Sequence, residues 1–321
     1  VHRKGMGYAI EKTEYDEAGR CISRFYYGSD GNPVFHTEYK CAGFRYAYDE
    51  RGNQSDIWYI GTDGNSVIRQ GLGYAHVEYV YDDKGRMTEE IYYDTSDKRT
   101  VCVESGYASC EYSYDEKEGE EGNCIESHYY YDVNRNPVLR KDTGYALVNL
   151  EYDALGRCVK EQYYDVWKEP VISTKYHCYG LEYLYDEKGN WTEIKYLDAQ
   201  GKPMIRSDCG VARVYKRYDS FGNLEGEDYF IVDEEAAGEE DIRWKPAVWK
   251  GKGYSSFTNL YDAVSGKCIE TYYEFDNNFV LSQEDGYAIA VKKYDEFGQL
   301  KAIHYKGADR QPVLSNESCA G

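Results

Sequence analysis

Residues 144–157 have the sequence Gly-Tyr-Ala-Leu-Val-Asn-Leu-Glu-Tyr-Asp-Ala-Leu-Gly-Arg, which predicts a strand followed by a tight turn. Val148, Leu150 and Tyr152 alternate with polar residues, and a period of two is typical of a half-buried β-strand. In the Asp-Ala-Leu-Gly-Arg segment, Asp opens the turn and Gly supplies a left-handed residue. The stretch therefore predicts the first strand and the turn of a β-hairpin.

The same strand and turn recur along the chain at a fixed interval. A Tyr-Asp pair ends the predicted first strand of nine units, with its tyrosine at Tyr15, Tyr48, Tyr81, Tyr114, Tyr152, Tyr185, Tyr218, Tyr261 and Tyr294. Six of the eight steps between these tyrosines are 33 residues long, and the other two are 38 and 43. Such a period is typical of a repeat array, in which each unit packs only on its neighbours.

Other features of the unit keep the same frame. A Gly-Tyr-Ala triplet, or a variant of it, starts eight residues before most Tyr-Asp pairs, whereas two units instead begin at Cys41 and Cys178. All six prolines lie at one position near the end of the unit, which suits an unpaired or edge position. A second tyrosine follows the first by eleven residues once an insertion is allowed for. These second-strand tyrosines are Tyr26, Tyr59, Tyr92, Tyr130, Tyr163, Tyr196, Tyr229, Tyr272 and Tyr305.

The repeat predicts an all-β fold. We expect a tandem array of about nine 33-residue antiparallel β-hairpin units that form a twisted solenoid or superhelix. The predicted repeat domain is single and spans residues 7–313, with short flanks at 1–6 and 314–321. Because repeat arrays need capped ends and neither flank has room for a cap, we expect the chain to be part of a longer protein.

The charge of the chain argues against two classes of partner. The 38 Lys and Arg residues are outnumbered by 58 Asp and Glu residues, so the formal net charge is −20. A surface of this charge repels the phosphates of nucleic acids and of anionic membranes. No apolar stretch approaches the ~18 residues of a membrane-spanning helix. We therefore predict no nucleic-acid partner and no membrane insertion.

No catalytic or metal-binding constellation is evident in the sequence. The six histidines lack zinc-ligand spacing, and the chain has neither a nucleophile elbow nor a phosphate-binding loop. We therefore predict that the protein is not an enzyme and has no cofactor and no metal. The aspartate of each Tyr-Asp pair is interpreted as a turn residue rather than a metal ligand. Two acidic insertions, near residues 116–122 and 232–243, are interpreted as solvated loops, with a calcium site or a partner contact as the alternatives.

Cysteine and tyrosine usage leaves two questions open. Several of the ten cysteines occupy positions where other units carry Met, Trp or Leu, which favours a small apolar core residue over stacked disulfides or a redox role. Tyrosine is abundant, with 38 Tyr against 9 Phe and 5 Trp. A ladder of tyrosines is either part of the core or, if exposed, a platform for sugar rings or for a partner. The nine second-strand tyrosines are the candidate ligand-binding residues, and the unit with Trp244 and Trp249 is the candidate specialised unit.

Two bacterial families resemble this pattern. Residues 151–157 and 294–298 resemble the YD repeats of the RHS family, whose Tyr-Asp-x-x-Gly-Arg turns punctuate a long spiralling β-sheet. That resemblance covers the first strand and turn of every unit, and it implies an extracellular or secreted protein that carries adhesion modules or encloses a toxin. Residues 26–31 and 163–165 are similar to the aromatic hairpin repeats of cell-wall-binding and glucan-binding modules, which bind choline or sugars.

These observations lead to two hypotheses about function. The first is a non-catalytic bacterial module, extracellular or on the cell surface, that binds a cell-wall or other glycan through exposed tyrosines. The alternative is a structural spacer, or an array for protein–protein interaction or adhesion. Solvent exposure of a tyrosine column distinguishes the two, because a buried column cannot stack on a sugar.

Overall fold

The structure is a computed structural model that describes residues 5–116, 124–233, 242–262 and 264–316. The described residues form twenty strands and no helix, so the predicted all-β fold is confirmed. None of the described residues belongs to a helix that could cross a membrane. The chain divides into two compact units.

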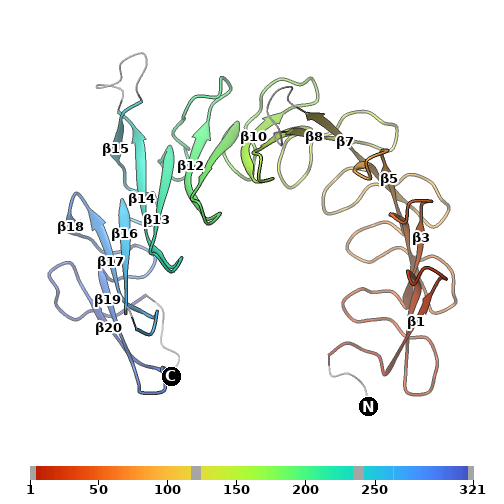
Figure 1. The fold of residues 1–321 in the computed structure, drawn as a ribbon, viewed down its shortest axis with the longest axis horizontal. Coiled ribbons are helices and arrows are strands. Elements are labelled where there is room, and N and C mark those ends of the chain that lie inside the picture. Colours follow the sequence, from red (N-terminus) through yellow and green to blue (C-terminus); the bar gives the residue numbers. More distant parts are fainter. Residues whose placement is uncertain (1–4, 117–123, 234–241, 263, 317–321) are drawn as a thin grey trace. The chain divides into compact units, whose positions relative to one another are not determined.

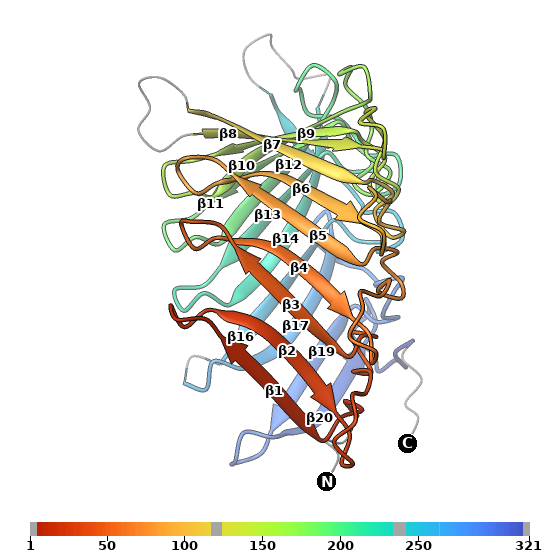
Figure 2. The ribbon, with the colours of Figure 1, turned by 90° about the vertical axis from the view of Figure 1, so that its right-hand side faces the viewer.

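The first compact unit comprises residues up to Arg157 together with Tyr163–Tyr176. Its strands pair with their neighbours in chain order, and every pairing is antiparallel (Figure 1). The strands are β1 (Ile10–Tyr15), β2 (Cys21–Tyr27), β3 (Gly43–Tyr48), β4 (Gln54–Ile60), β5 (His76–Tyr81), β6 (Met87–Tyr93), β7 (Ser109–Glu116), β8 (Cys124–Tyr131) and β9 (Leu147–Tyr152). In strands β1 to β6, the hairpin turns lie at one end of the strands and the longer connections lie at the opposite end (Figure 2).

The second compact unit comprises Cys158–Gln162 and the residues from His177 onward. It follows the same antiparallel scheme, with two short additional strands beside its hairpins. Its strands are β11 (Gly180–Tyr185), β12 (Trp191–Leu197), β13 (Arg213–Tyr218), β14 (Leu224–Val232), β15 (Trp244–Pro246), β16 (Ser256–Tyr261), β17 (Cys268–Phe275), β18 (Asn278–Phe279), β19 (Ile289–Tyr294) and β20 (Leu300–Lys306). Strand β10 (Cys158–Tyr164) contributes its first five residues to this unit.

The hairpin turn has the geometry that the Asp-x-x-Gly motif predicts. Asp49 N donates to Asn53 O at 2.9 Å, and Gly52 N donates to Asp49 O at 3.0 Å. Gly52 has a φ of 93°, so it is the residue of left-handed conformation that the turn requires. Pairing then skips one residue, since Ala47 is opposite Asp56 whereas Tyr48 is opposite Gln54. The predicted turn with a bulge is therefore confirmed.

The core of each repeat lies between the sheet and the segment that returns from its second strand. In five of the nine repeats, the residue 21 positions after the Tyr of the Tyr-Asp pair, insertions excluded, packs on the second-strand tyrosine. His36 lies 4.8 Å from the ring of Tyr26, and the Arg206 guanidinium lies 4.5 Å above the ring of Tyr196. Because such a core is only one ring thick, tyrosine suits it better than a wholly apolar residue, since the hydroxyl finds a polar partner at the edge.

The two units that depart from the Gly-Tyr-Ala start preserve this packing by substitution. Cys178 is fully buried where other units place the tyrosine of the triplet, and it is too small to reach the neighbouring ring. Tyr176, two residues earlier, stacks on Tyr163 instead, at 5.6 Å. In the other unit Tyr39 approaches Tyr26 in the same way, at 6.4 Å. The departures in sequence therefore move a ring rather than remove it.

The cysteines of the described chain are not cross-linked. All nine described cysteines are free thiols, and five of them are buried: Cys41, Cys102, Cys110, Cys178 and Cys209. Burial raises the pKa of the Cys41 thiol to about 11, so it stays protonated and poorly nucleophilic at neutral pH. These positions support the interpretation of cysteine as a small apolar core residue.

Candidate functional site

The second-strand tyrosines, predicted as ligand-binding residues, are mostly inside the protein. Seven of the nine expose 6% of their surface or less: Tyr26, Tyr59, Tyr92, Tyr130, Tyr163, Tyr196 and Tyr229. Six of these rings pack on the tyrosines of the Gly-Tyr-Ala triplets, as in the parallel pair Tyr145 and Tyr163 with centroids 4.8 Å apart, and the ring of Tyr196 packs under Arg206 instead. A ring packed on both faces offers no face to a sugar, so these seven residues form the core ladder and not a binding platform.

The eighth tyrosine of that set, Tyr272, lies on the opposite face of the sheet from the core. The turn after Tyr261 has one extra residue, because Tyr261 is opposite Cys268, seven residues away, whereas Tyr218 is opposite Leu224, six residues away. A shift of one residue exchanges the two faces of a strand. Tyr273 is therefore the buried residue of this unit and packs 4.6 Å from Tyr254. Tyr272, the candidate ligand-binding residue, stacks on Phe279 at 5.5 Å instead.

The ninth tyrosine of the set, Tyr305, is half-buried and borders a cleft. It packs 4.6 Å from Tyr287 and lines a cleft of about 450 Å³ with Ile303, His304 and Val313 among its other walls. The cleft is open to solvent, and one histidine and two lysines are among the residues that line it. Tyr305 is thus the member of the predicted set that lines a cleft, and the neighbouring tyrosines do not extend it into a platform.

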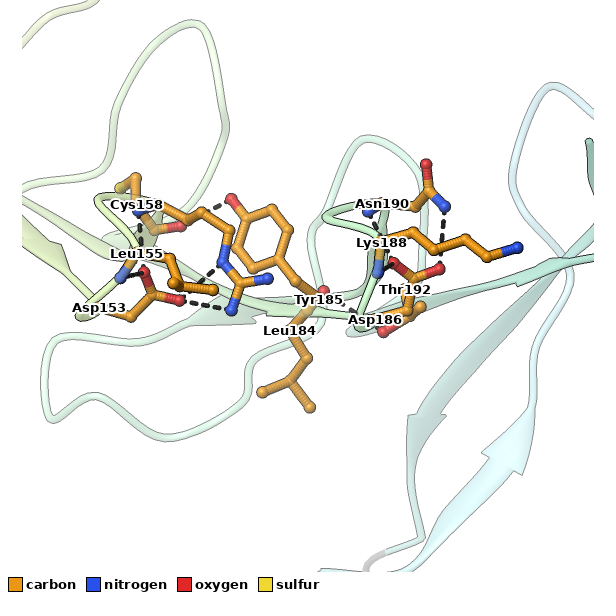
Figure 3. Close-up of polar contacts among 10 residues, drawn as sticks. Asp153, Leu155, Cys158, Leu184, Tyr185, Asp186, Lys188, Asn190 and Thr192 are labelled. Carbon is orange, nitrogen blue, oxygen red and sulfur yellow. Dashed lines mark hydrogen bonds and ion pairs between the residues drawn. The ribbon is translucent and has the colours of Figure 1, made fainter. Parts of the chain in front are cut away.

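The tyrosine of the Tyr-Asp pair joins each repeat to the one before it. Tyr185 donates its hydroxyl hydrogen to Cys158 O at 2.8 Å, and Tyr81 donates to Gln54 O at 3.0 Å (Figure 3). Tyr48, Tyr114, Tyr218, Tyr261 and Tyr294 make the equivalent bond to the first residue of the preceding second strand. The motif therefore has two structural tasks, which are to form the turn and to fix the next repeat.

The aspartate of the pair is hydrogen-bonded within its own turn. Asp186 Oδ1 accepts the N–H groups of Lys188 and Asn190 at 2.9 and 2.8 Å, and Oδ2 accepts the Asn190 side-chain amide at 2.9 Å (Figure 3). That amide is the main reason why the pKa of Asp186 lies below its ordinary value. Within the described residues, no group of three or more His, Cys, Asp and Glu side chains could hold a metal ion.

Because the turn aspartates are ionised in the folded protein, we expect the thermal stability of the protein to fall in acid. Hydrogen bonds from Asn53 and Arg51 hold the pKa of Asp49 below its ordinary value of 3.8. A carboxylate whose pKa is lowered by folding stabilises the fold above the unfolded pKa, and that stabilisation is lost as the pH falls through the folded pKa. We expect Asp49→Ala to lower Tm at pH 7 and to lower it less near pH 2. Thermal unfolding followed by circular dichroism at both pH values measures this, and an equal effect at the two would contradict it.

Glu90, beside the core ladder of the first compact unit, has a raised pKa, unlike the turn aspartates. Burial raises the pKa of Glu90, while the hydroxyl groups of Tyr92 and Tyr112 donate to it at 2.8 and 3.3 Å. A buried acid with a raised pKa is a common feature of catalytic sites. Here the carboxyl is enclosed by tyrosine rings, and Tyr112 alone of these three residues lines a cleft in the described chain. The contacts of Glu90 fit a satisfied core acid.

A row of exposed apolar side chains is the surface feature that repeats in register. It is formed by the residue 20 positions after the Tyr of each Tyr-Asp pair, insertions excluded, and we call it the outer row. Its members are Phe35, Ile68, Val101, Leu139 and Ile172 in the first compact unit, and Ile205, Val248, Leu281 and Leu314 in the second. Eight of the nine expose between 37% and 91% of their surface, and Val101 is half-buried.

Backbone hydrogen bonds on both sides hold the outer row in place. Next to Ile172, Val171 N donates to Tyr163 O at 3.0 Å, and Thr174 N donates to Thr143 O at 2.9 Å. The chain is extended here, so Val171 and Ser173 face the core while Ile172 faces solvent. The N–H groups of the nine row residues have no hydrogen-bond acceptor in the described part of the chain. The row thus presents apolar side chains and free N–H donors from a fixed backbone.

Sequence analysis missed the outer row, although the signal was present. All nine residues are Phe, Ile, Val or Leu at one repeat position, in a chain whose aromatic residues are mostly tyrosine. Their position beside the prolines made them resemble ordinary residues of a turn. Burial could not be assigned to this extended segment from sequence, because only the hydrogen bonds of the return segment determine which of its alternating residues face out.

The unit predicted to be specialised uses its tryptophans for packing. Trp249 lies edge-on to Tyr229 at 4.9 Å, and the Lys252 ammonium lies 4.6 Å above its ring. Arg213 packs on Trp244 at 5.1 Å. Both tryptophans therefore have partners within the fold. The acidic insertions that were predicted to be solvated loops lie largely at residues 117–123 and 234–241, outside the described residues.

Comparison with known proteins gives no family assignment. No family model and no curated protein matches the chain. Among solved structures, the chain is similar to a mutant Photorhabdus luminescens Tc holotoxin pore, with 13% identity and a TM-score of 0.27, over 94% of this chain and 16% of that one. A TcdB2-TccC3 crystal structure aligns with 11% identity and a TM-score of 0.24, again over 94% of this chain and 16% of that one. The chain spans about a sixth of each, and TM-scores this low do not establish a shared fold.

Proposed function

We propose that this chain is a non-catalytic repeat scaffold that binds protein partners along its outer row. The observation that supports this most is the recurrence of an exposed apolar side chain at one position in eight of nine repeats. Single exposed apolar residues are normal on protein surfaces, but rows of them mark interaction sites. A spacer needs no such row, because it has only to hold its ends apart.

The chemistry of the outer row favours a protein over a glycan. Sugar-binding platforms use flat aromatic faces, and Phe35 is the row's one aromatic member. Aliphatic side chains pack instead against the apolar side chains of another protein. Each repeat adds two strands, so successive row residues lie about 9.6 Å apart where the strands are regularly spaced. A partner segment with apolar side chains at a similar interval would contact several repeats at once.

The location of the protein is part of this proposal. The resemblance to YD repeats favours an extracellular or cell-surface setting, as predicted from the sequence. Five of the nine free thiols are buried, which protects them from oxidants in such a setting. The glycan hypothesis has lost its main support, because seven of its nine candidate tyrosines are core residues.

A peptide-display selection against the purified chain tests the proposed function. We expect selected peptides to bind through the outer row, so that the double variant Leu139→Ser, Ile172→Ser weakens binding about tenfold or more. The matched control is Leu155→Ser, which removes an apolar side chain that is 76% exposed but lies in a hairpin turn of the same compact unit. Equal affinity for the double variant and the control would contradict the proposal. So would saturable binding to insoluble polysaccharide that the row variants do not alter.

A further inference from the structure

A cleft between two successive hairpin turns of the second compact unit differs from its counterparts elsewhere in the chain. It lies between the turns that follow Tyr218 and Tyr261 and has a volume of about 350 Å³. This is at the small end of the range for ligand pockets. Its walls include the apolar side chains Phe221, Leu260 and Ile269 and the acidic residues Asp219, Glu225 and Asp262. No lysine or arginine lines it.

In two other places a cation of the chain itself bridges the two turns. Arg51 is the third residue after Tyr48, and its guanidinium donates to Asp82 O at 2.9 Å and to the Asp83 carboxylate at 2.8 Å, both in the next turn. Lys188, the third residue after Tyr185, donates in the same way to Ser220 O at 2.5 Å. A cation that bridges successive turns is therefore an arrangement that this fold accommodates.

At the cleft after Tyr218, the third residue is Phe221 in place of a cation. Its ring is 78% exposed, and the cations nearest in sequence are engaged elsewhere. Arg217 pairs with Asp228, and Lys267 donates to Gly298 O in the following turn. The cleft thus retains the acidic wall without the internal cation.

The acidic wall is ionised and has spare acceptors. Hydrogen bonding by Asn223 lowers the pKa of Asp219, and hydrogen bonding by Ser265 lowers that of Asp262. A carboxylate has about four lone-pair sites, and the turn uses three of those on Asp219. Glu225 is exposed and has no hydrogen-bond or ion-pair partner in the described part of the chain.

We propose that this cleft binds an arginine side chain of a basic protein segment, with an apolar neighbour of that arginine packed on Phe221 and Leu260. The guanidinium lies between the turns after Tyr218 and Tyr261, as Arg51 lies between the turns after Tyr48 and Tyr81. Its positive charge offsets the negative charge of the acidic wall. An arginine fits better than a lysine, because its planar fork can donate to a carboxylate and to a backbone carbonyl together. The net charge of −20 adds long-range attraction for a basic segment.

A labelled peptide of alternating arginine and leucine is the probe, with a second peptide in which citrulline replaces arginine. Fluorescence anisotropy should show binding of the arginine peptide that weakens with salt and is lost with citrulline. Glu225→Gln should weaken it about tenfold or more, which is the effect of one hydrogen bond to a charged group. Phe221→Ala should also weaken it about tenfold, because it removes the apolar contact with the neighbour of the arginine. The control Glu50→Gln changes a carboxylate beside the cleft that Arg51 already fills, and it should leave the affinity unchanged.

A variant that places a cation in the cleft tests the geometry. Phe221→Arg places a cation at the repeat position of Arg51, beside the acidic wall, so it should abolish peptide binding while Tm stays the same or rises. Equal binding by Phe221→Arg and the unmodified chain would overturn the proposal, as would equal binding of the citrulline peptide. The outcome is independent of the proposed function, because the outer row lies on other residues and its variants leave this cleft intact.

Discussion

Tyr229→Ala is expected to lower the free energy of unfolding of the second compact unit by about 3–5 kcal/mol, the usual range for an aromatic residue removed from a core. Tyr229 is fully buried, packed on Trp249 at 4.9 Å and on Tyr254 at 6.0 Å. Its hydroxyl donates to Glu227 at 2.8 Å and accepts from Lys252 at 2.9 Å. The substitution therefore removes a ring and takes one hydrogen-bond partner from each of two charged groups. Urea unfolding followed by far-UV circular dichroism measures the loss.

Two controls separate the ring from the hydroxyl and from tyrosine in general. Tyr229→Phe keeps the ring, so it should cost less, about 1–3 kcal/mol for the lost hydrogen bonds to charged groups. Tyr15→Ala removes a ring that is 62% exposed and should change stability little. If Tyr229→Ala proved no more destabilising than Tyr15→Ala, the core ladder would not be what holds the repeats together.

Gly180→Ala is expected to destabilise the same compact unit by about 1–3 kcal/mol, because the core cannot accept the added methyl group. A Cβ on Gly180 would lie 2.3 Å from Glu161 O, a backbone atom of the adjacent strand β10. Alanine also reduces the entropy of the unfolded chain, which stabilises by about 0.4–1 kcal/mol, so the steric term is the larger one. Unfolding in urea gives the net effect.

The control for this glycine comes from another repeat. Ser109 occupies the equivalent position at the start of β7, is fully buried, and has a hydroxyl with no hydrogen-bond partner. Ser109→Ala should therefore leave stability unchanged or raise it, since an unsatisfied buried hydroxyl is lost. A stable Gly180→Ala variant would show that strands β10 and β11 can separate at this point without cost.

The hairpins were predictable from sequence because their causes are local. Alternation in residues such as Val148 and Leu150 fixes a strand, and the Asp-x-x-Gly motif fixes the turn by hydrogen bonds within five residues. The period then places each hairpin beside the next one. Antiparallel pairing within each hairpin follows, since its turn is too short for a crossover to a parallel partner.

The faces of the sheet were harder to predict because they depend on register. One extra residue in the turn after Tyr261 moves Tyr272 away from the core and brings Tyr273 into it. The sequence shows two adjacent tyrosines and cannot say which faces inward. The exposure of the outer row depends on the return segment, whose course is set by hydrogen bonds between repeats such as that from Thr174 N to Thr143 O.

The prediction of the second-strand tyrosines as the binding site, in place of the outer row, has a related cause. Abundant tyrosine suggested a platform, but a one-ring core needs a residue that is apolar in its body and polar at its tip, and tyrosine meets both requirements. The cleft near Phe221 is recognised only by comparison with Arg51, and that comparison requires the side-chain contacts of the neighbouring turns.

Chemical nitration of tyrosines in the folded protein, read by mass spectrometry, tests the buried ladder most directly. Nitration acts on accessible phenolate, and burial raises the pKa of both Tyr26 and Tyr229. We predict that Tyr15 is nitrated rapidly while Tyr26, Tyr163 and Tyr229 are protected until the chain unfolds. Nitration of those three residues at the rate of Tyr15 in the folded protein would contradict the account and return the tyrosine column to the surface.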